Sequence, residues 1–236
     1  ILTKRNPEIS SYAKNIFLVN DFSLETFLCN SHIESFINKN FRDIDFAVIG
    51  PEQPLKEGFA DFFESIGIRT IGPKMNLAKL ETSKLYCREF LRKNRLSHLS
   101  PMWCDISGMT KFNVYKNFKF LNKKYGNLVV KKVGLCSGKG VKVQGVDFND
   151  LPDIEDFIFN DQDTAQEIIL EERLVGDEFS MMSLYNPNGI IYHFPPVKDY
   201  KRRFNKNTGP NTGSMGAVVN KNNTLDYLTQ IDLNLV

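Results

Sequence analysis

The sequence predicts an α/β protein with a parallel β-sheet in its first part and a second unit after it. Two observations carry this prediction: short apolar runs alternate with helical patterns between residues 45 and 94, and the pattern changes after Ser100. Strands that alternate with helices are typical of a parallel sheet whose faces are covered by those helices. A chain of 236 residues is long enough for one or two domains with a sizeable buried core.

The strands of the first part are marked by short apolar runs that end at glycine. Residues 45–50 form such a run, which is the pattern of a buried parallel strand. Residues 68–71 give a second strand, which ends at Gly72 and Pro73. The segment 56–65 between the strands is expected to be a helix. Its apolar face consists of Phe59, Phe62 and Phe63.

Two further helices follow from apolar residues spaced three and four apart. Asn76 is a candidate cap for a helix that runs to about Asn94. The expected inner side of this helix consists of Leu77, Leu80, Cys87 and Leu91. The second unit begins near Ser100–Pro101, and the apolar face of its helix consists of Val114, Phe118, Leu121 and Tyr125. The opposite, solvated face is expected to carry Lys111, Lys116, Lys119, Lys123 and Lys124.

The rest of the second unit reads as strands joined by turns. Residues 128–131 and 141–143 are strands on either side of the glycine-rich segment 134–140, and residues 168–172 form another strand. The segments 178–185 and 190–193 are expected to pair as a hairpin through the turn Asn-Pro-Asn-Gly. A polar loop rich in glycine and threonine follows at residues 208–216.

Composition excludes several classes of protein. Thirty Lys and Arg against 28 Asp and Glu give a net charge of +2, which provides no general attraction to nucleic acid or to an anionic membrane. No apolar run approaches the ~20 residues of a membrane span. The four cysteines form no CxxC pair, so free thiols in a reducing cytoplasm are expected instead of zinc or disulfides. The two ends of the sequence predict that it is part of a longer protein.

The segment 134–140, Gly-Leu-Cys-Ser-Gly-Lys-Gly, is a candidate phosphate-binding loop. Glycines let backbone amides approach a phosphate closely, and Lys139 adds a positive charge. The segment lacks the GxxxxGK[ST] pattern and the following helix of a Walker A loop. Between two antiparallel strands it would act as a flap over a nucleotide. An ordinary hairpin turn with a solvated lysine is the alternative.

An ordered set of charged residues surrounds this loop. Lys131 ends the strand before it, Lys84 lies in the middle of the helix expected over 76–94, and Glu171, Glu172 and Glu178 follow later. Each of these alone is more often a solvated surface residue. Together, a strand-borne lysine, a glycine flap, a pair of glutamates and a further glutamate are typical of an adenine-nucleotide site.

Six stretches of the sequence resemble the glycinamide ribonucleotide synthetase (phosphoribosylamine–glycine ligase) family of ATP-grasp enzymes. They follow the family's order and spacing from about Ile33 to Val219. The most specific stretch is DYKR at residues 199–202 followed by TGPNTGSMGA at residues 208–217, because other ATP-grasp ligases lack this combination. The matching stretches are 48–55, 71–73, 80–84, 130–141, 171–178, and 199–202 with 208–217.

The resemblance implies that ATP binds between two lobes. Lys84 and Lys131 would hold the α- and β-phosphates, and Glu178 would hold the ribose hydroxyls. Glu171, Glu172 and the backbone through Leu174 would read the adenine. The flap over the phosphates would consist of Gly134, Ser137, Gly138, Lys139 and Gly140.

The resemblance also implies the reaction. Glycine is joined to 5-phosphoribosylamine through a glycyl phosphate, with ATP cleaved to ADP and phosphate. Lys131, Lys201 and Arg202 would be catalytic through charge stabilisation, with no protein nucleophile. ATP and Mg²⁺, with Mn²⁺ as an alternative metal, would be the cofactors, and the family's metal ligands lie beyond Val236. The substrate-binding residues would be Glu52, Asp199, Asn211, Thr212 and Gly213. Glu52 has a second interpretation as a turn residue that caps the next helix.

For the architecture, the resemblance implies a partial N-terminal pre-ATP-grasp domain over residues 1–78, without its first strand. An incomplete ATP-grasp domain would follow over residues 79–236, with its small mobile lobe at about 100–172. A cytoplasmic monomer that binds small molecules, and neither nucleic acid nor membrane, is expected. Two alternatives stay open: a non-catalytic nucleotide-binding remnant, and a different ATP-grasp ligase such as a carboxylase.

The sequence departs from the family pattern at a few positions. Val133 stands where the family usually has Asp, Tyr200 where it has His, and Ser214 where it has Gly. Cys136 replaces a small residue in the flap. The changes at Val133 and Tyr200 are expected to affect substrate contacts more than nucleotide contacts.

Overall fold

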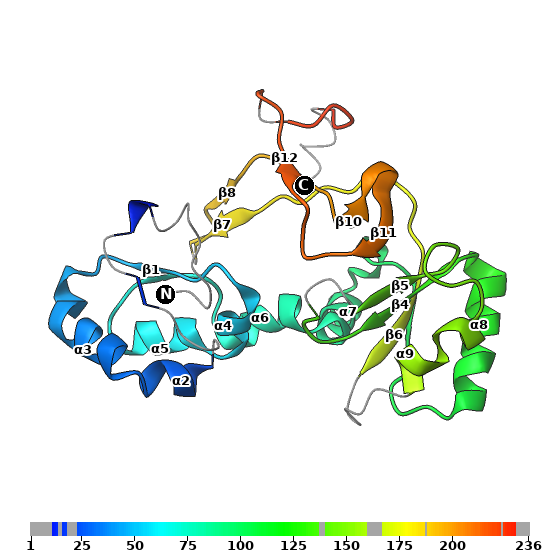
Figure 1. Cartoon of the computed structure of the whole chain (residues 1–236), viewed down its shortest axis with the longest axis horizontal. Coiled ribbons are helices and arrows are strands. Elements are labelled where there is room, and N and C mark those ends of the chain that lie inside the picture. Colours follow the sequence, from blue (N-terminus) through cyan, green and yellow to red (C-terminus); the bar gives the residue numbers. More distant parts are fainter. Residues whose placement is uncertain are drawn as a thin grey trace. The chain divides into compact units, whose positions relative to one another are not determined.

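A computed structural model describes residues 11–13, 16–17, 23–136, 140–159, 167–186, 188–222 and 224–229. The chain divides into two compact units, Ile1–Ser100 and Pro101–Val236 (Figure 1). The boundary between them coincides with the change of sequence pattern expected after Ser100. No helix in the described ranges is long and apolar enough to cross a membrane.

A parallel pair of strands lies in the first unit, as the sequence predicts. β1 (Ala47–Val48) and β2 (Thr70–Ile71) pair with Ala47 opposite Thr70. Both strands are shorter than the apolar runs that predict them. Before β1 lie the helices α2 (Leu24–Leu28) and α3 (Ser31–Asn40) among others, and the 3₁₀ turn η1 (Phe41–Asp43) follows α3.

Aromatic side chains form the core of the first unit. Phe27 of α2 and Phe59 of α5 (Phe59–Ser65) are buried, with their ring centroids 4.9 Å apart in an edge-on arrangement. Phe62 and Phe63 pack against the same cluster, which confirms the apolar face predicted for this helix. Edge-on aromatic pairs contribute about 0.5–1.5 kcal/mol beyond the area they bury.

Two helices of the first unit are divided where the sequence predicted continuous ones. The helix expected from residue 56 begins only at Phe59, because Gly58 has a left-handed backbone (φ +82°) that separates α5 from α4 (Glu52–Lys56). The helix expected over 76–94 is two helices, α6 (Met75–Thr82) and α7 (Lys84–Lys93). Ser83 between them is extended, and its hydroxyl accepts a hydrogen bond from the Tyr86 amide.

The start and the inner side of α6 also differ from prediction. Asn76 lies inside the helix, and the Asp61 carboxylate accepts a hydrogen bond from the Met75 amide at 2.8 Å, which fixes the first turn. Leu77 and Leu80 are exposed and do not form an inner side. The unit ends with the 3₁₀ turn η2 (Ser97–Leu99).

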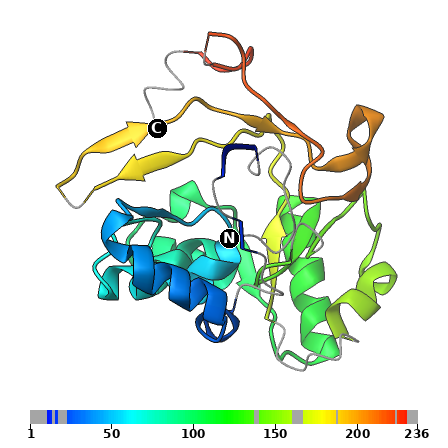
Figure 2. The same cartoon turned by 60° about the vertical axis from the view of Figure 1, so that its left-hand side comes forward.

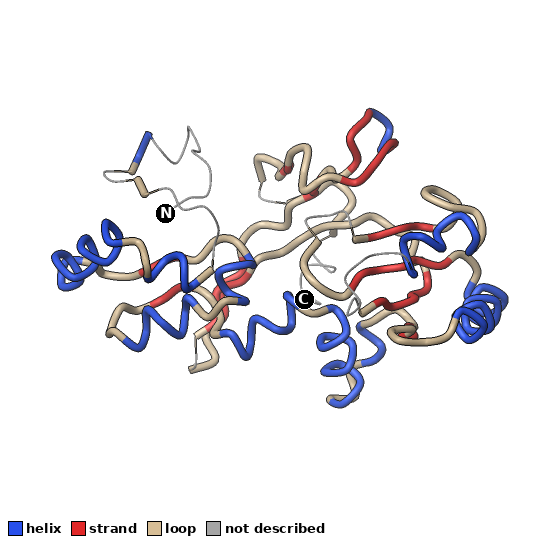
Figure 3. The backbone as a smooth tube through the Cα atoms, turned by 60° about the horizontal axis from the view of Figure 1, so that its bottom comes forward, coloured by secondary structure: helices blue, strands red, loops and turns tan. Residues whose placement is uncertain are grey.

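The second unit is built on an antiparallel sheet with the strand order β3-β6-β4-β5. Its strands are β3 (Trp103–Asp105), β4 (Leu128–Lys132), β5 (Val141–Val143) and β6 (Ile168–Glu172). Figure 3 shows strands in red and helices in blue, with α8 (Lys111–Tyr125) beside this sheet. The 3₁₀ turn η3 (Leu151–Ile154) leads into α9 (Glu155–Phe159).

The face of α8 that the sequence predicts as apolar is buried against this sheet. Val114, Phe118 and Leu121 are buried together with Leu128 and Leu170. Thr110 caps the helix through its hydroxyl, and Gly126 ends it with a positive φ of 77°. The five lysines expected on the solvated face are exposed. Hydrophobic burial therefore fixes the sheet that carries Lys131, Glu171 and Glu172.

After β6, the described residues form three strand pairs. The predicted hairpin is present as β7 (Ser183–Tyr185) and β8 (Ile191–His193), with Ser183 opposite His193 (Figure 2). Most of its apolar side chains are exposed, among them Tyr185, Ile191 and Tyr192. β9 (Lys198–Asp199) pairs with β12 (Ala217–Val218), and β10 (Arg202–Phe204) pairs with β11 (Thr208–Asn211) through the turn η4 (Asn205–Asn207).

The segment 208–216 was predicted as a loop, but its first part is the strand β11. Apolar periodicity does not reveal this strand, because it reads Thr-Gly-Pro-Asn. The strand is held instead by backbone pairing with β10 and by packing of Gly209 against the Phe204 ring. Glycine is required at this position, because φ is +80° and an added Cβ would lie 2.4 Å from Cδ2 of Phe204.

Candidate functional site

Lys131 and Glu171 form the centre of the candidate nucleotide site in the second unit. Lys131 of β4 lies opposite Ile169, and Glu171 of β6 lies opposite Val129, so the two side chains are diagonal neighbours on one face of the sheet. The Lys131 ammonium lies 2.5 Å from Oε2 of Glu171. The glutamate side chain is 1% exposed and the lysine 24%. A buried carboxylate thus faces a cation that still reaches the surface.

The glycine-rich segment joins β4 to β5 in an antiparallel hairpin, as the sequence predicts. The Lys132 amide donates a hydrogen bond to the Gly140 carbonyl at 2.8 Å, which closes the base of the hairpin. A Cβ on Gly140 would lie 2.6 Å from Cβ of Cys136, so glycine is required there by the flap's own packing. At Gly134 an added Cβ would meet nothing within 4 Å. The predicted flap residues Ser137, Gly138 and Lys139 lie outside the described residues.

The segment after β6 presents apolar surface next to the two glutamates. Glu172 ends β6, and its amide donates to the Met102 carbonyl at 2.9 Å. The Arg173 amide donates to the Asn127 carbonyl at 2.9 Å, which fixes the exit of the strand. Leu174 and Val175 follow and are 68% and 89% exposed. An exposed apolar pair beside polar backbone groups is the kind of surface on which a flat heterocyclic base packs.

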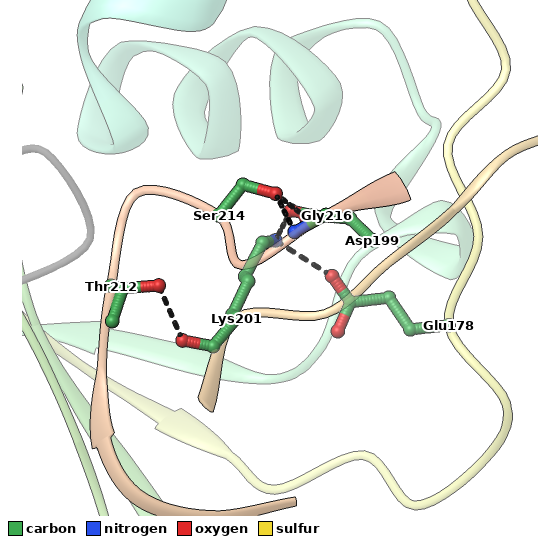
Figure 4. Close-up of polar contacts among 6 residues, drawn as sticks. All are labelled: Glu178, Asp199, Lys201, Thr212, Ser214 and Gly216. Atoms are coloured by element: carbon green, nitrogen blue, oxygen red, sulfur yellow. Dashed lines mark hydrogen bonds and ion pairs between the residues drawn. The ribbon is translucent and has the colours of Figure 1, made fainter. Parts of the chain in front are cut away.

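Glu178, Asp199 and Lys201 meet in a polar cluster in the same unit (Figure 4). The Lys201 ammonium lies 2.8 Å from Oε1 of Glu178 and 3.9 Å from Oδ2 of Asp199. The hydroxyl of Ser214 donates to Oδ1 of Asp199 at 2.6 Å and accepts from the Gly216 amide at 3.1 Å. Ser214, which departs from the family pattern within the loop expected on the substrate side, is therefore a further member of this cluster.

The loop 212–216 is tied to the strand segment 199–202 by its backbone. The Thr212 amide and hydroxyl both donate to the Lys201 carbonyl, at 2.7 and 2.9 Å. The Met215 amide donates to the Tyr200 carbonyl, and the Tyr200 amide donates to the Gly216 carbonyl. The predicted substrate residues Asp199, Thr212 and Gly213 thus belong to one hydrogen-bonded segment, and Asn211 is the last residue of β11, opposite Arg202.

Arg202 is held in place by the carboxylate of Asp147, a residue that the sequence analysis did not single out. The guanidinium Nη1 donates to Oδ1 of Asp147 at 2.9 Å and Nη2 donates to Oδ2 at 3.3 Å. Burial raises the pKa of the Asp147 carboxyl, but hydrogen bonds from Arg202 and from the Val143 amide outweigh burial and leave this pKa below its usual value of 3.8. The two residues are 55 positions apart, so no local motif signals the pair.

The two site residues predicted in the first unit lie at helix starts. Glu52 is the first residue of α4, directly after the carboxyl end of β1 and Gly50–Pro51, and is exposed. Open α/β sheets bind ligands at this position. Lys84 was expected in the middle of a helix, but it is the first residue of α7, after the cap Ser83. It therefore stands beside the amides of a helix N-terminus, which favour anions.

The described residues contain no group of three or more His, Cys, Asp or Glu side chains that fits a metal ion. His32 and His98 are exposed, and Nδ1 of His193 shares a hydrogen bond of 2.7 Å with the Ser183 hydroxyl.

Comparison with known protein families covers nearly the whole chain. The model of the phosphoribosylglycinamide synthetase N domain matches residues 1–81, and the model of the ATP-grasp (A) domain of the same synthetase matches residues 82–234. The chain belongs to the phosphoribosylglycinamide synthetase family. The resemblance drawn from the sequence motifs is thereby confirmed, as is the fold class of a parallel-sheet N-terminal domain followed by an ATP-grasp domain.

Curated relatives of the synthetase family extend well beyond this chain. A phosphoribosylamine–glycine ligase from Methanococcoides burtonii is 30% identical over 236 residues, which are 99% of this chain and 50% of the relative. The enzyme of that name from Methanocella arvoryzae is 34% identical over 196 residues, 81% of this chain and 42% of the relative. The chain spans about half the length of the curated relatives it matches.

Solved structures agree with the ATP-grasp fold. The crystal structure of phosphoribosylamine–glycine ligase from Thermotoga maritima superposes with a TM-score of 0.54 at 25% identity, covering 76% of this chain and 43% of that one. D-Alanine–D-alanine ligase from Bacillus anthracis gives a TM-score of 0.53 at 21% identity, covering 80% of this chain and 58% of that one. The second likeness concerns the fold alone.

Proposed function

We propose that this chain provides ATP-binding and substrate-binding residues of an ATP-dependent carbon–nitrogen ligase of purine biosynthesis. The ligase joins glycine to 5-phosphoribosylamine and releases glycinamide ribonucleotide, ADP and phosphate. The single observation that carries the proposal is the match of both synthetase domain models, which together cover residues 1–234 in family order. The cations of the ion pairs in the second unit would supply the positive charge that such a reaction requires.

For the nucleotide, we assign phosphate binding to Lys131 and Lys84, adenine binding to the segment 171–174, and the ribose hydroxyls to Glu178. The pairing of Lys131 with Glu171 supports the phosphate role of the lysine, because it fixes the position of an ammonium-bearing side chain that is still 24% exposed. The exposed Leu174 supports the adenine role. The open space at Gly134 supports a flap that a phosphate can approach closely.

For the reaction, the glycine carboxylate attacks the γ-phosphate of ATP, and the amine of phosphoribosylamine then attacks the carbonyl of the resulting glycyl phosphate. Both steps are accelerated by fixed positive charge and by correct placement of the reactants. The cations we assign to this task are Lys131, Lys201 and Arg202. We assign substrate binding to the residues that the motifs indicate, namely Glu52, Asp199, Asn211, Thr212 and Gly213. Lys201 lies 2.8 Å from Glu178, so binding of a sugar hydroxyl to Glu178 would loosen Lys201 and make its ammonium available to substrate oxygens.

We include a divalent cation in the proposal, Mg²⁺ with Mn²⁺ as an alternative, since phosphoryl transfer requires neutralisation of the triphosphate. We further propose a cytoplasmic monomer that acts on small molecules. Cys29, Cys87, Cys104 and Cys136 are free thiols, which supports a reducing compartment. Analytical ultracentrifugation tests the monomer.

The experiment combines binding and turnover. Isothermal titration of the 236-residue chain with ATP measures binding, and ADP formation by the natural full-length protein measures the reaction. ADP is expected only when glycine and phosphoribosylamine are both present, and Lys131→Ala is expected to abolish its formation. Lys132→Ala is the matched control, because this neighbour on β4 places its ammonium 4.8 Å from the Phe157 ring centroid instead.

Three outcomes separate the alternatives. ADP formation that Lys131→Ala leaves unchanged eliminates the phosphate role of this lysine. ATP binding without ADP formation by the full-length protein, whatever substrate is added, assigns a nucleotide-binding function without catalysis. ADP formation that requires bicarbonate or another acceptor in place of glycine assigns a different ATP-grasp ligase.

A further inference from the structure

Asp147 is a fixed carboxylate to which the proposed reaction assigns no role. It lies in the turn after β5, where its amide donates to the Val143 carbonyl at 2.8 Å and its Oδ2 accepts from the Val143 amide at 2.9 Å. Two hydrogen bonds to one strand residue fix both the backbone and the carboxylate of Asp147. The carboxylate is thus attached rigidly to the end of the four-stranded sheet.

Arg202 connects this carboxylate to the strand pair β10–β11. Both of its Nη atoms donate to Asp147, and Nη1 also donates to the Gly209 carbonyl at 2.8 Å. The side chains of Arg202 and Asp147 are only 10% and 16% exposed. A forked guanidinium–carboxylate pair of this kind has a defined geometry, unlike most surface ion pairs. The guanidinium therefore fixes β11 relative to the sheet.

The contacts continue from Arg202 into the loop 212–216. The preceding residue, Lys201, accepts two hydrogen bonds from Thr212, and Asp199 accepts one from Ser214. A continuous series of hydrogen bonds thus runs from β5 through Asp147 and Arg202 to the segment to which we assign substrate binding. The strand pair β10–β11 has no further strand beside it among the described residues, and two isolated strands are only marginally stable in water.

We propose that Asp147 is a positioning residue for the substrate loop. Through the Arg202 guanidinium it holds the strand pair β10–β11, and with it the loop 212–216, on the sheet that carries Lys131. The assignment of this loop to the substrate rests on the proposed function, whereas the attachment of the loop to the sheet does not.

The test replaces Asp147 by asparagine. Both carboxylate oxygens accept hydrogen bonds, Oδ1 from Arg202 and Oδ2 from Arg202 and Val143. In either orientation, an asparagine amide places an NH₂ donor against one of these donors, and the charge is lost as well. Hydrogen exchange measured by mass spectrometry on the 236-residue chain is expected to become about tenfold faster in residues 202–216, the effect of losing one charge-assisted hydrogen-bonded pair. Exchange in β4 and β6 stays unchanged.

The controls separate this pair from charge removal in general. Asp177→Asn removes a carboxylate of the same unit that pairs loosely with Lys198, at 3.5 Å and with 63% exposure, and is expected to leave residues 202–216 unchanged. Asp147→Glu keeps the charge and is expected to restore most of the protection. Arg202→Gln is expected to act like Asp147→Asn, and the double variant to add nothing further.

The proposal is overturned by unchanged exchange in residues 202–216 of Asp147→Asn, by equal acceleration in β4 and β6, or by failure of Asp147→Glu to restore protection. ATP titration of the same variants keeps the two proposals apart. If the parent chain does not bind ATP, the nucleotide role fails, while the exchange data still decide the role of Asp147. In the full-length protein we expect Asp147→Asn to raise KM for glycine or phosphoribosylamine several-fold and to leave KM for ATP unchanged. An equal rise in the KM for ATP and in the KM for the other substrates refutes the positioning role of Asp147.

Discussion

Replacing Lys131 by methionine removes the ammonium group that lies 2.5 Å from the buried Glu171 carboxylate. Methionine keeps a similar volume, so the main loss is the charge-assisted hydrogen bond. Such a bond contributes about 1.5–3 kcal/mol, and the 1% exposure of Glu171 places this pair in the upper half of that range. We therefore expect the free energy of unfolding of the second unit to fall by about 2–3 kcal/mol.

Removal of the carboxylate from this pair, instead of the ammonium, is expected to lower the free energy of unfolding by less. Glu171→Gln leaves the ammonium on Lys131, whose 24% exposure gives it access to water, so we expect a loss of about 1 kcal/mol. The double variant Lys131→Met with Glu171→Gln contains neither charge and is expected to be within about 1 kcal/mol of the parent, because a buried ion pair is often replaced by neutral groups at little cost. All three variants are expected to bind ATP more weakly, or to discriminate less between ATP and nucleotides with another base.

The chain contains its own probe for this experiment. Trp103 is the single tryptophan, and it lies on β3 directly opposite Glu171. Its fluorescence in urea reports the unfolding of this sheet. A loss of about 2 kcal/mol lowers the midpoint by roughly 1 M for a typical dependence of about 2 kcal/mol per molar urea. Lys132→Met is the matched control on the same strand, with an expected loss of about 0.5–1 kcal/mol from its contact with Phe157. If Lys131→Met costs no more than Lys132→Met, the pair with Glu171 does not stabilise the sheet.

Three further predictions follow from other residues. Gly209→Ala is expected to destabilise the β10–β11 pair by at least ~1 kcal/mol, because φ is +80° and the added Cβ would lie 2.4 Å from Phe204; Gly213→Ala, whose Cβ meets nothing within 4 Å, is the neutral control in urea unfolding. The hydrogen bonds of Asp147 outweigh burial and lower its pKa from 3.8, so its contribution to stability is present above pH ~4 and lost as pH falls through the pKa of the folded state. The difference in urea unfolding midpoint between the parent and Asp147→Asn should therefore shrink below pH ~4. A difference that stays constant contradicts the stabilising role of the Asp147 carboxylate. The hydrogen bond to Glu155 raises the pKa of Tyr115 to about 12, so the ultraviolet titration of the parent should extend to higher pH than that of Glu155→Gln. The stability linked to this shift is present below the ordinary value of 10.0 and lost as pH rises toward 12.

Helix and strand identities were predictable wherever burial imposes a period on the sequence. Val114, Phe118 and Leu121 repeat at helical spacing, and they are buried against the sheet as expected. The breaks at Gly58 and Ser83 were not predictable from periodicity, because the first depends on the left-handed backbone of one residue and the second on an extended residue whose hydroxyl caps the next helix. Leu77 fits a helical repeat equally well but is exposed.

The candidate site was predictable where the residues lie close together in a motif. The segments 171–178 and 199–216 could be assigned from their motifs, and the second unit brings Glu178, Asp199 and Lys201 together. The partner of Arg202 was not predictable, since Asp147 lies 55 positions away in a stretch without any motif. Sequence motifs therefore mark residues that are expected to bind ligands more readily than the residues that hold them in place.

The strand pair β7–β8 has a practical consequence for work with this chain. Tyr185, Ile191 and Tyr192 are 69%, 53% and 61% exposed, and both outer edges of the pair have no neighbouring strand among the described residues. Exposed apolar edges of this kind recruit strands from other molecules. The 236-residue chain, proposed above to be a monomer, should therefore aggregate through these edges only as its concentration rises, and a charged substitution such as Ile191→Lys should keep concentrated solutions clear.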